Sequence, residues 1–314
     1  MIIKSFKIIL FFLFFFSLQS CGGEDLETVI PEYYQYNRPS DSNTGQDDTP
    51  TGDTKTLKIL AIGNSFTDDG TGYLPSLVQK AGIENVTIAK MVVGGTSLQY
   101  HYTHAINNDS VYNFYVSTNG SFKSQGKKNF SDCFLFENWD YIILQQVSQY
   151  SGMYETYQPY LNNLINIISK YHPQAVIGWQ MTWAYSSTSS HSGFKNYGSS
   201  QTIMYESILN AVNQMKTETG ISVVIPTGMV IQELRGTSIC NNLELTRDGY
   251  HLDYGAGRYA AACTWFETLI RPIFQIGIKG NPLRANTGKI PVTDDVAVLC
   301  QDISENVVKN YYGN

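Results

Sequence analysis

Short apolar runs alternate with amphipathic stretches along most of the chain. Five runs are almost continuously apolar, as expected of strands buried on both faces, and they cover residues 57–62, 86–93, 141–144, 175–181 and 223–226. Between them, apolar residues recur every three or four positions, which predicts helices near 74–78, 157–168, 205–215 and 256–270. This alternation predicts an α/β fold in which helices cover both faces of a central parallel sheet.

Two segments interrupt the alternation. Residues 99–138 are rich in Tyr, Asn, Ser and Phe and show little periodicity, and residues 183–200 begin Trp-Ala-Tyr and continue with Ser, Thr and His. Ligands of open α/β sheets bind beyond the carboxyl ends of the strands, so both segments suit the rim of a binding site. Surface loops without a function are an equally good interpretation. We expect one domain over 56–272, with 273–314 packed on it as a C-terminal extension of no assigned function.

The first twenty residues have the pattern of a secretory signal peptide. Lys4 and Lys7 flank the start of an apolar run over 8–18, which is shorter than the roughly 20 residues that a membrane-spanning helix needs. The run ends in Leu-Gln-Ser-Cys, which resembles a lipobox and predicts cleavage after residue 20 and a lipid on Cys21. An ordinary signal peptide or an uncleaved anchor is the alternative. The predicted product is an exported lipoprotein of the bacterial outer membrane, facing the periplasm or the cell surface.

Composition narrows the choice of partners. Residues 21–55 are polar and poor in aliphatic side chains, which predicts a flexible linker behind the lipid anchor. The chain has a formal net charge of −6, and removal of the two lysines with the signal peptide makes it about −8. This balance argues against nucleic acid as a partner and against membrane contact other than through the anchor.

Cysteine and histidine spacing gives no metal site. No CxxC pair occurs, and the apolar surroundings of Cys263 indicate a packed core thiol. Whether the four cysteines after Cys21 form disulfides stays open; they are Cys133, Cys240, Cys263 and Cys300. The histidines outside the motif described below have no partners at ligand spacing and are His101, His104, His172 and His191. We interpret His101 and His104 as a surface or rim feature, and we expect neither metal nor cofactor.

A serine follows the first predicted strand directly. In Gly63-Asn64-Ser65, a hydroxyl at the end of a buried strand would face solvent beside an unpaired backbone N–H. A nucleophile that attacks a carbonyl group needs both features, although a serine here could simply cap the next helix.

An aspartate and a histidine lie close together near the other end of the chain. Asp248 and His251 are three residues apart on a turn that Gly249 eases, so the carboxylate can accept the Nδ1 hydrogen while Nε2 points outward as a base. Asp253 is an alternative orienting carboxylate, and an ordinary surface histidine is the simpler interpretation of this turn by itself.

Together these motifs resemble the first and last blocks of the SGNH/GDSL hydrolase superfamily, over residues 57 to about 272. The resemblance implies a flavodoxin-like, three-layer α/β/α fold and a catalytic triad of Ser65, Asp248 and His251. It also implies an oxyanion hole made by the N–H of Ser65 and that of Gly94 or Gly95. Asn64 stands where the signature usually has aspartate.

The third block of the family, Gly-x-Asn-Asp, is absent. Leu-Gln-Gln-Val-Ser stands in its place, so Gln145 or Gln146 could supply the side-chain donor of the oxyanion hole. This block resembles that of carbohydrate acetyl-esterase branches of the superfamily. The resemblance implies a serine esterase that removes O-acetyl groups from an acylated glycan or cleaves another small ester. The alternatives are a lipase or thioesterase of the same fold, and a non-catalytic carbohydrate-binding lipoprotein.

Overall fold

The structure is a computed structural model that describes residues 55–240 and 243–313. The predicted signal peptide, Cys21 and all but the end of the linker lie outside these residues. In the described part of the chain, no helix is long and apolar enough to cross a membrane.

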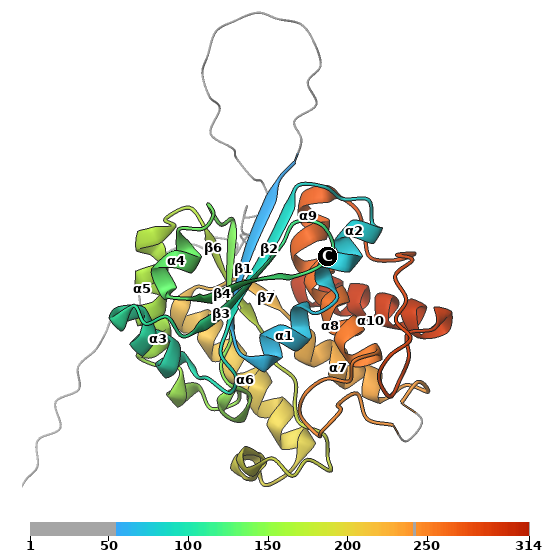
Figure 1. The fold of residues 1–314 in the computed structure, drawn as a ribbon. Coiled ribbons are helices and arrows are strands. Elements are labelled where there is room, and N and C mark those ends of the chain that lie inside the picture. Colours follow the sequence, from blue (N-terminus) through green and yellow to red (C-terminus); the bar gives the residue numbers. More distant parts are fainter. Residues whose placement is uncertain (1–54, 241–242, 314) are drawn as a thin grey trace, which may run out of the picture. The chain divides into compact units, whose positions relative to one another are not determined.

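A seven-stranded sheet of order β4-β3-β2-β1-β5-β6-β7 forms the centre (Figure 1). The five predicted strands are confirmed and pair in parallel in the order β2-β1-β5-β6-β7. Their bounds are β1 Leu57–Gly63, β2 Val86–Val92, β5 Tyr141–Leu144, β6 Val176–Gln180 and β7 Val223–Ile225. The middle strands are apolar on both sides because helices cover both faces of the sheet.

The segment 99–138 is not a long irregular loop, so that prediction is wrong. It contains most of helix α3 (Leu98–Asn107), the antiparallel strands β3 (Tyr112–Ser117) and β4 (Lys123–Lys128), and the short helix α4 (Phe130–Phe134). β3 buries Tyr112, Phe114 and Val116 at alternate positions. β4, with the sequence KSQGKK, is almost wholly exposed at the edge of the sheet, so it carries no hydrophobic signal.

Helices lie on both faces of the sheet, as predicted (Figure 1). One layer contains α3, α4, α5 (Tyr160–Tyr171) and α6 (Gln201–Thr219). The other contains α1 (Ser65–Thr71), α2 (Leu74–Lys80), α7 (Thr227–Arg235), α8 (Ala256–Trp265) and α10 (Asp294–Tyr312). A π-helical turn η4 (Phe266–Ile270) and α9 (Arg271–Phe274) continue α8, and short 3-10 turns cover Ser148–Tyr150, Tyr154–Thr156 and Ser192–Tyr197.

The fold brings several chain segments to one edge of the sheet. Because β1, β2, β5 and β6 are parallel, the residues after their carboxyl ends meet there: Ser65, Gly94, Gln145 and Trp183. The loop before α8 reaches the same edge, since its residue Leu252 donates a backbone hydrogen bond to Asp69 of α1.

Candidate active site

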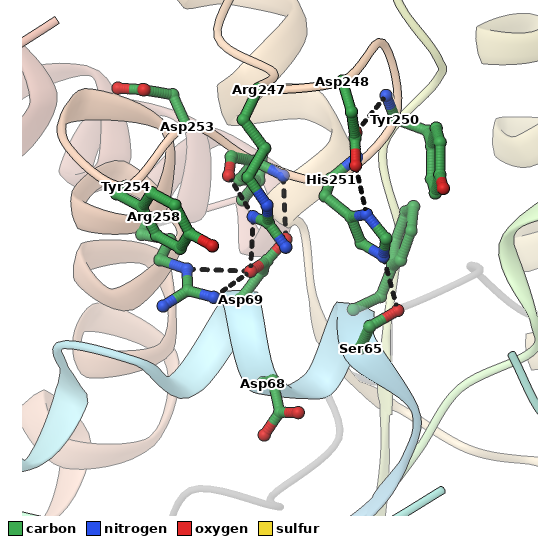
Figure 2. A network of polar contacts seen from close by, with 12 residues as sticks. Ser65, Asp68, Asp69, Arg247, Asp248, Tyr250, His251, Asp253, Tyr254 and Arg258 are labelled. Carbon is green, nitrogen blue, oxygen red and sulfur yellow. Dashed lines mark hydrogen bonds and ion pairs between the residues drawn. The ribbon is translucent and has the colours of Figure 1, made fainter. Parts of the chain in front are cut away.

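Three side chains from distant parts of the chain form one hydrogen-bonded row (Figure 2). The His251 Nε2 atom lies 2.8 Å from Ser65 Oγ, and His251 Nδ1 lies 2.6 Å from Asp248 Oδ2. Ser65 is the first residue of α1, while the other two side chains come from the loop before α8. The structure therefore brings together the three residues that the sequence motifs single out.

The arrangement fixes the roles that the imidazole atoms can take. A carboxylate only accepts hydrogen bonds, so the contact with Asp248 places a hydrogen on Nδ1 and leaves the Nε2 lone pair facing the Ser65 hydroxyl. Burial alone would raise the pKa of Asp248, but hydrogen bonds from the His251 ring and from the backbone N–H groups of His251 and Tyr250 outweigh it and lower that pKa. The carboxylate thus stays charged and can stabilise an imidazolium ion.

The loop that contains Asp248 and His251 is closed on itself and fastened to its neighbours. Its two ends are joined by a 2.8 Å hydrogen bond from the Arg247 N–H to the His251 carbonyl. Gly249 at the tip has φ +93°, and a Cβ there would lie 2.9 Å from the Cα of Ser189, so both the turn and the close packing require glycine. The N–H of Ser186 donates to the Gly249 carbonyl at 2.8 Å.

Aromatic side chains surround the imidazole. The buried Trp183 stacks on Phe66 with ring centroids 4.2 Å apart and donates its Nε1–H to the Tyr250 carbonyl at 2.7 Å. The Tyr250 ring lies 4.3 Å from the His251 ring and 4.8 Å from that of His191. The segment 183–200 therefore supports the candidate site, with its first residues buried beneath it.

Asp253 does not take part in this row. Its carboxylate accepts hydrogen bonds from the backbone N–H groups of Gly255, Lys289 and Ile290, and Figure 2 shows it directed away from His251. The alternative that Asp253 orients His251 is therefore wrong.

Asn64 organises the turn before Ser65. Its Oδ1 atom caps α1 by accepting from the Phe66 N–H at 2.9 Å, and its Nδ2 atom donates to the Thr96 carbonyl at 2.9 Å. Gln145 Nε2 also donates to Asn64 Oδ1, at 2.7 Å. An aspartate here would face the Thr96 carbonyl without a hydrogen to donate, which explains why an amide suits this position.

Backbone donors are available beside Ser65. The N–H groups of Ser65, Gly94 and Gly95 have no hydrogen-bond partner in the described part of the chain, and both glycines are exposed. Gly95 has φ +69°, a backbone conformation that favours glycine. The role of these N–H groups in an oxyanion hole stays a prediction, and Gly94 and Gly95 both remain candidates.

A buried network holds the turn that follows β2. The Thr96 hydroxyl donates to the Val93 carbonyl at 2.7 Å and lies 3.3 Å from His101 Nε2, while His101 Nδ1 lies 3.3 Å from the Tyr112 hydroxyl. Burial lowers the pKa of His101 to about 3. His101 is thus a neutral internal support of the glycine turn, and its interpretation as a surface or rim residue is wrong.

The two glutamines after β5, Gln145 and Gln146, differ in the hydrogen bonds that their side-chain amides make. Gln146 uses its whole amide: Oε1 accepts from the N–H groups of Leu98 and Val147, and Nε2 donates to the Thr156 carbonyl and hydroxyl. Gln145 is also buried, and its donor contact is to Asn64. Gln146 therefore holds together the segments that it bonds. Gln145 supports the turn before Ser65 through its hydrogen bond to Asn64.

Asp69 is the main polar residue near the site that the sequence motifs do not indicate. It lies one turn after Ser65 and is fully buried, with its carboxylate bound to Arg247 and Arg258 (Figure 2). The available signal was weak: two acidic residues in the helix after Ser65, and an arginine directly before Asp248.

The remaining histidines and cysteines have structural partners or lie in the core. His104 pairs with Asp109, and His172 Nε2 lies 2.8 Å from the Phe134 carbonyl. The four cysteines after residue 54 are free and buried. Over residues 55–240 and 243–313, no three His, Cys, Asp or Glu side chains lie together in a way that could hold a metal ion.

Comparison with known proteins identifies relatives of the whole domain. The model of the family described as Domain of unknown function (DUF4886) matches residues 58–295. The crystal structure of a DUF4886 family protein from Bacteroides uniformis is 35% identical, with a TM-score of 0.73 and coverage of 81% of this chain and 95% of that one. No curated protein matches significantly.

Two more distant structures are described as hydrolases. One, from Slackia heliotrinireducens and provisionally described as an SGNH hydrolase, is 20% identical over 68% of this chain and 98% of that one, with a TM-score of 0.48. A mutant of Axe2, an acetylxylan esterase from Geobacillus stearothermophilus, is 14% identical over 70% and 95%, with a TM-score of 0.43. The family assignment rests on the closer likeness to the B. uniformis protein and on the family model.

Proposed function

This chain belongs to the DUF4886 family, and we propose that it is a serine esterase in which Ser65 is the nucleophile, His251 the general base and acid, and Asp248 the orienting carboxylate. The observation that supports this most strongly is the unbroken row from Ser65 Oγ through both imidazole nitrogens to Asp248, with contacts of 2.8 and 2.6 Å. Each contact is within the reach that proton transfer and imidazole orientation need.

In the proposed first half-reaction, Ser65 Oγ attacks the ester carbonyl carbon while its proton passes to His251 Nε2. The charge on Asp248 stabilises the imidazolium ion so formed. The tetrahedral intermediate then collapses, the bond to the alcohol oxygen breaks, and His251 returns the proton to the leaving alcohol. The acyl group stays on Ser65 as an ester.

In the second half-reaction, His251 takes a proton from water as the water oxygen attacks the acyl carbon. The bond between that carbon and Ser65 Oγ then breaks, the acid is released, and His251 returns the proton to Ser65 Oγ. In both halves the carbonyl oxygen becomes negative and needs donors. We assign this role to the N–H groups of Ser65 and of Gly94 or Gly95, whose lack of other partners in the described residues supports it. Loss of one such donor typically costs about 3 kcal/mol in the barrier.

The proposed substrate is an O-acetylated carbohydrate. The backbone at Gly94 and Gly95 is open, with nothing within 4 Å of where a Cβ would lie. The ring of Tyr250 lies against the His251 ring, and the ring of His191 lies against that of Tyr250. Such rings suit the faces of sugars, and a small acyl group needs no long apolar groove. A lipase or thioesterase would prefer longer acyl chains.

Nitrophenyl esters of increasing acyl length test this proposal. We expect the wild-type protein to hydrolyse the acetyl ester fastest and Ser65→Ala to lose at least about 1,000-fold in kcat/KM. Ser131→Ala is a suitable control, because its hydroxyl contacts Tyr171 on an exposed surface. Activity unchanged in Ser65→Ala would exclude the nucleophile, and a preference for long acyl chains would exclude the deacetylase version alone.

We also propose that the protein is exported and anchored by a lipid on Cys21, on the basis of the signal-peptide pattern. Metabolic labelling with a palmitate analogue should mark the wild-type chain in membranes and not a Cys21→Ser variant. Labelling of both variants to the same extent would contradict lipidation at this residue.

A further inference from the structure

The carboxylate of Asp69 collects donors from both sides of the loop that contains His251. Arg247 Nη1 lies 3.0 and 3.1 Å from its two oxygens, and the Leu252 N–H donates to Oδ2 at 2.8 Å. Arg258 adds Nε at 2.8 Å and Nη2 at 2.6 Å on Oδ1. Figure 2 shows these contacts converging on one buried side chain.

The position of these donors in the chain is informative. Arg247 directly precedes Asp248, and Leu252 directly follows His251, so the contacts bracket the segment that contains both proposed partners of Ser65. Asp69 itself lies on α1, one helical turn after Ser65. One carboxylate therefore ties the helix that begins with Ser65 to both ends of the segment with His251.

The two guanidinium groups are held in turn. Both lie over the ring of Tyr254, at 4.7 Å for Arg247 and 4.6 Å for Arg258. Arg247 Nη1 also donates to the Leu252 carbonyl, which closes the base of the loop. Because Asp69 is 0% exposed, water cannot replace it as the acceptor for these groups.

From this geometry we propose that Asp69 is a positioning residue that sets the distance between Ser65 Oγ and His251 Nε2. The inference rests on the proposed function, since it concerns the geometry of that nucleophile and base. Proton transfer tolerates little displacement, and a shift of about 1 Å can cost about 100-fold in rate. Asp69 does not touch the substrate in this account, so its loss changes kcat and leaves KM nearly unchanged.

Asp69→Asn tests the proposal, because it keeps the shape but offers one acceptor oxygen and brings amide hydrogens toward the arginines. We expect kcat to fall about 100-fold, with KM within about twofold of wild type. Modification by a fluorophosphonate probe should slow to a similar degree. Arg247→Gln, which removes a donor within the loop, should lower kcat more than Arg258→Gln, which removes a donor from α8.

Glu267→Gln is the matched control. Glu267 is also a buried carboxylate, bound by Arg271 Nη1 at 2.7 Å and by the Ile278 N–H, but it lies in η4 at the far end of α8. We expect it to lower the melting temperature with kcat of the folded protein unchanged. The proposal is overturned if Asp69→Asn keeps the wild-type kcat, or if both variants lose kcat equally. An effect on KM alone would also overturn it, whereas an active Ser65→Ala variant would refute the proposed function instead.

Discussion

The side chain of Asn64 donates a 2.9 Å hydrogen bond to the carbonyl of Thr96, and so joins the turn after β1 to the turn after β2. The first turn contains Ser65 and the second contains Gly94 and Gly95. The proposed nucleophile and the proposed backbone donors are therefore connected through one buried amide.

Asn64→Asp should weaken this connection, although the signature of the SGNH/GDSL superfamily usually has aspartate at this position. The carboxylate would still cap α1 at Phe66 but would place a charge against the Thr96 carbonyl. We expect a loss of about 2 kcal/mol in the free energy of unfolding and about a tenfold fall in kcat.

Urea denaturation and steady-state kinetics measure the two effects of that substitution. The control is Asn129→Asp, because Asn129 caps α4 through Oδ1, an atom that aspartate retains. Equal stability of the Asn64→Asp variant and the wild type would show that the bond to Thr96 does not hold the turns together.

His101 should make the protein less stable in acid. Its ordinary pKa of 6.5 applies to the unfolded chain, and burial lowers it to about 3 in the folded protein. Below pH 6.5 the imidazole of His101 therefore binds a proton in the unfolded chain but not in the folded protein. The contribution of His101 to the free energy of unfolding is complete above pH 6.5 and is lost progressively as the pH falls toward 3. Between pH 6 and pH 4 the free energy of unfolding should fall by roughly 2.5 kcal/mol more in the wild type than in His101→Gln.

Urea denaturation at several pH values tests this expectation, because contributions from other groups cancel between the variants. Tyr112→Phe removes the hydroxyl that contacts His101 Nδ1 but keeps the imidazole, so it should retain most of the pH dependence. Identical slopes of stability against pH in the wild type and in His101→Gln would contradict a neutral buried imidazole.

Trp183→Phe should loosen the loop with His251 without removing the aromatic stack. Phenylalanine can still lie on Phe66, but the hydrogen bond from Nε1 to the Tyr250 carbonyl is lost. We expect a fall in kcat of roughly fivefold and a loss of about 2 kcal/mol in stability.

The control for Trp183→Phe is Trp139→Phe, which removes a similar buried bond from Nε1 to the Cys133 carbonyl. It should cost similar stability and leave kcat of the folded protein unchanged. The same kcat loss in both variants would show that the Trp183 effect is general destabilisation.

Local patterns predicted the parallel strands because these strands are buried on both faces. The same reasoning could not find β4, whose sequence KSQGKK pairs through its backbone while its side chains face solvent. Burial of β3 at alternate positions was visible in principle, but the surrounding polar residues obscured it.

Residue types and chain order also indicated Ser65, Asp248 and His251, because few kinds of side chain can serve as nucleophile, base and orienting carboxylate. The supporting contacts were beyond sequence reasoning. Asp69 meets Arg247 across 178 residues, and neither has a local pattern that distinguishes it from a surface charge. The different roles of Gln145 and Gln146 likewise depend on which partners the fold brings to each amide.

Covalent labelling tests the central claim most directly. The purified protein would be treated with a fluorophosphonate probe, digested and mapped by mass spectrometry, beside Ser65→Ala and His251→Asn. The account predicts one adduct per chain on the peptide with Ser65, no adduct in Ser65→Ala, and labelling slowed at least about 100-fold in His251→Asn. An adduct on another residue, or ester hydrolysis at the wild-type rate by Ser65→Ala, would contradict it.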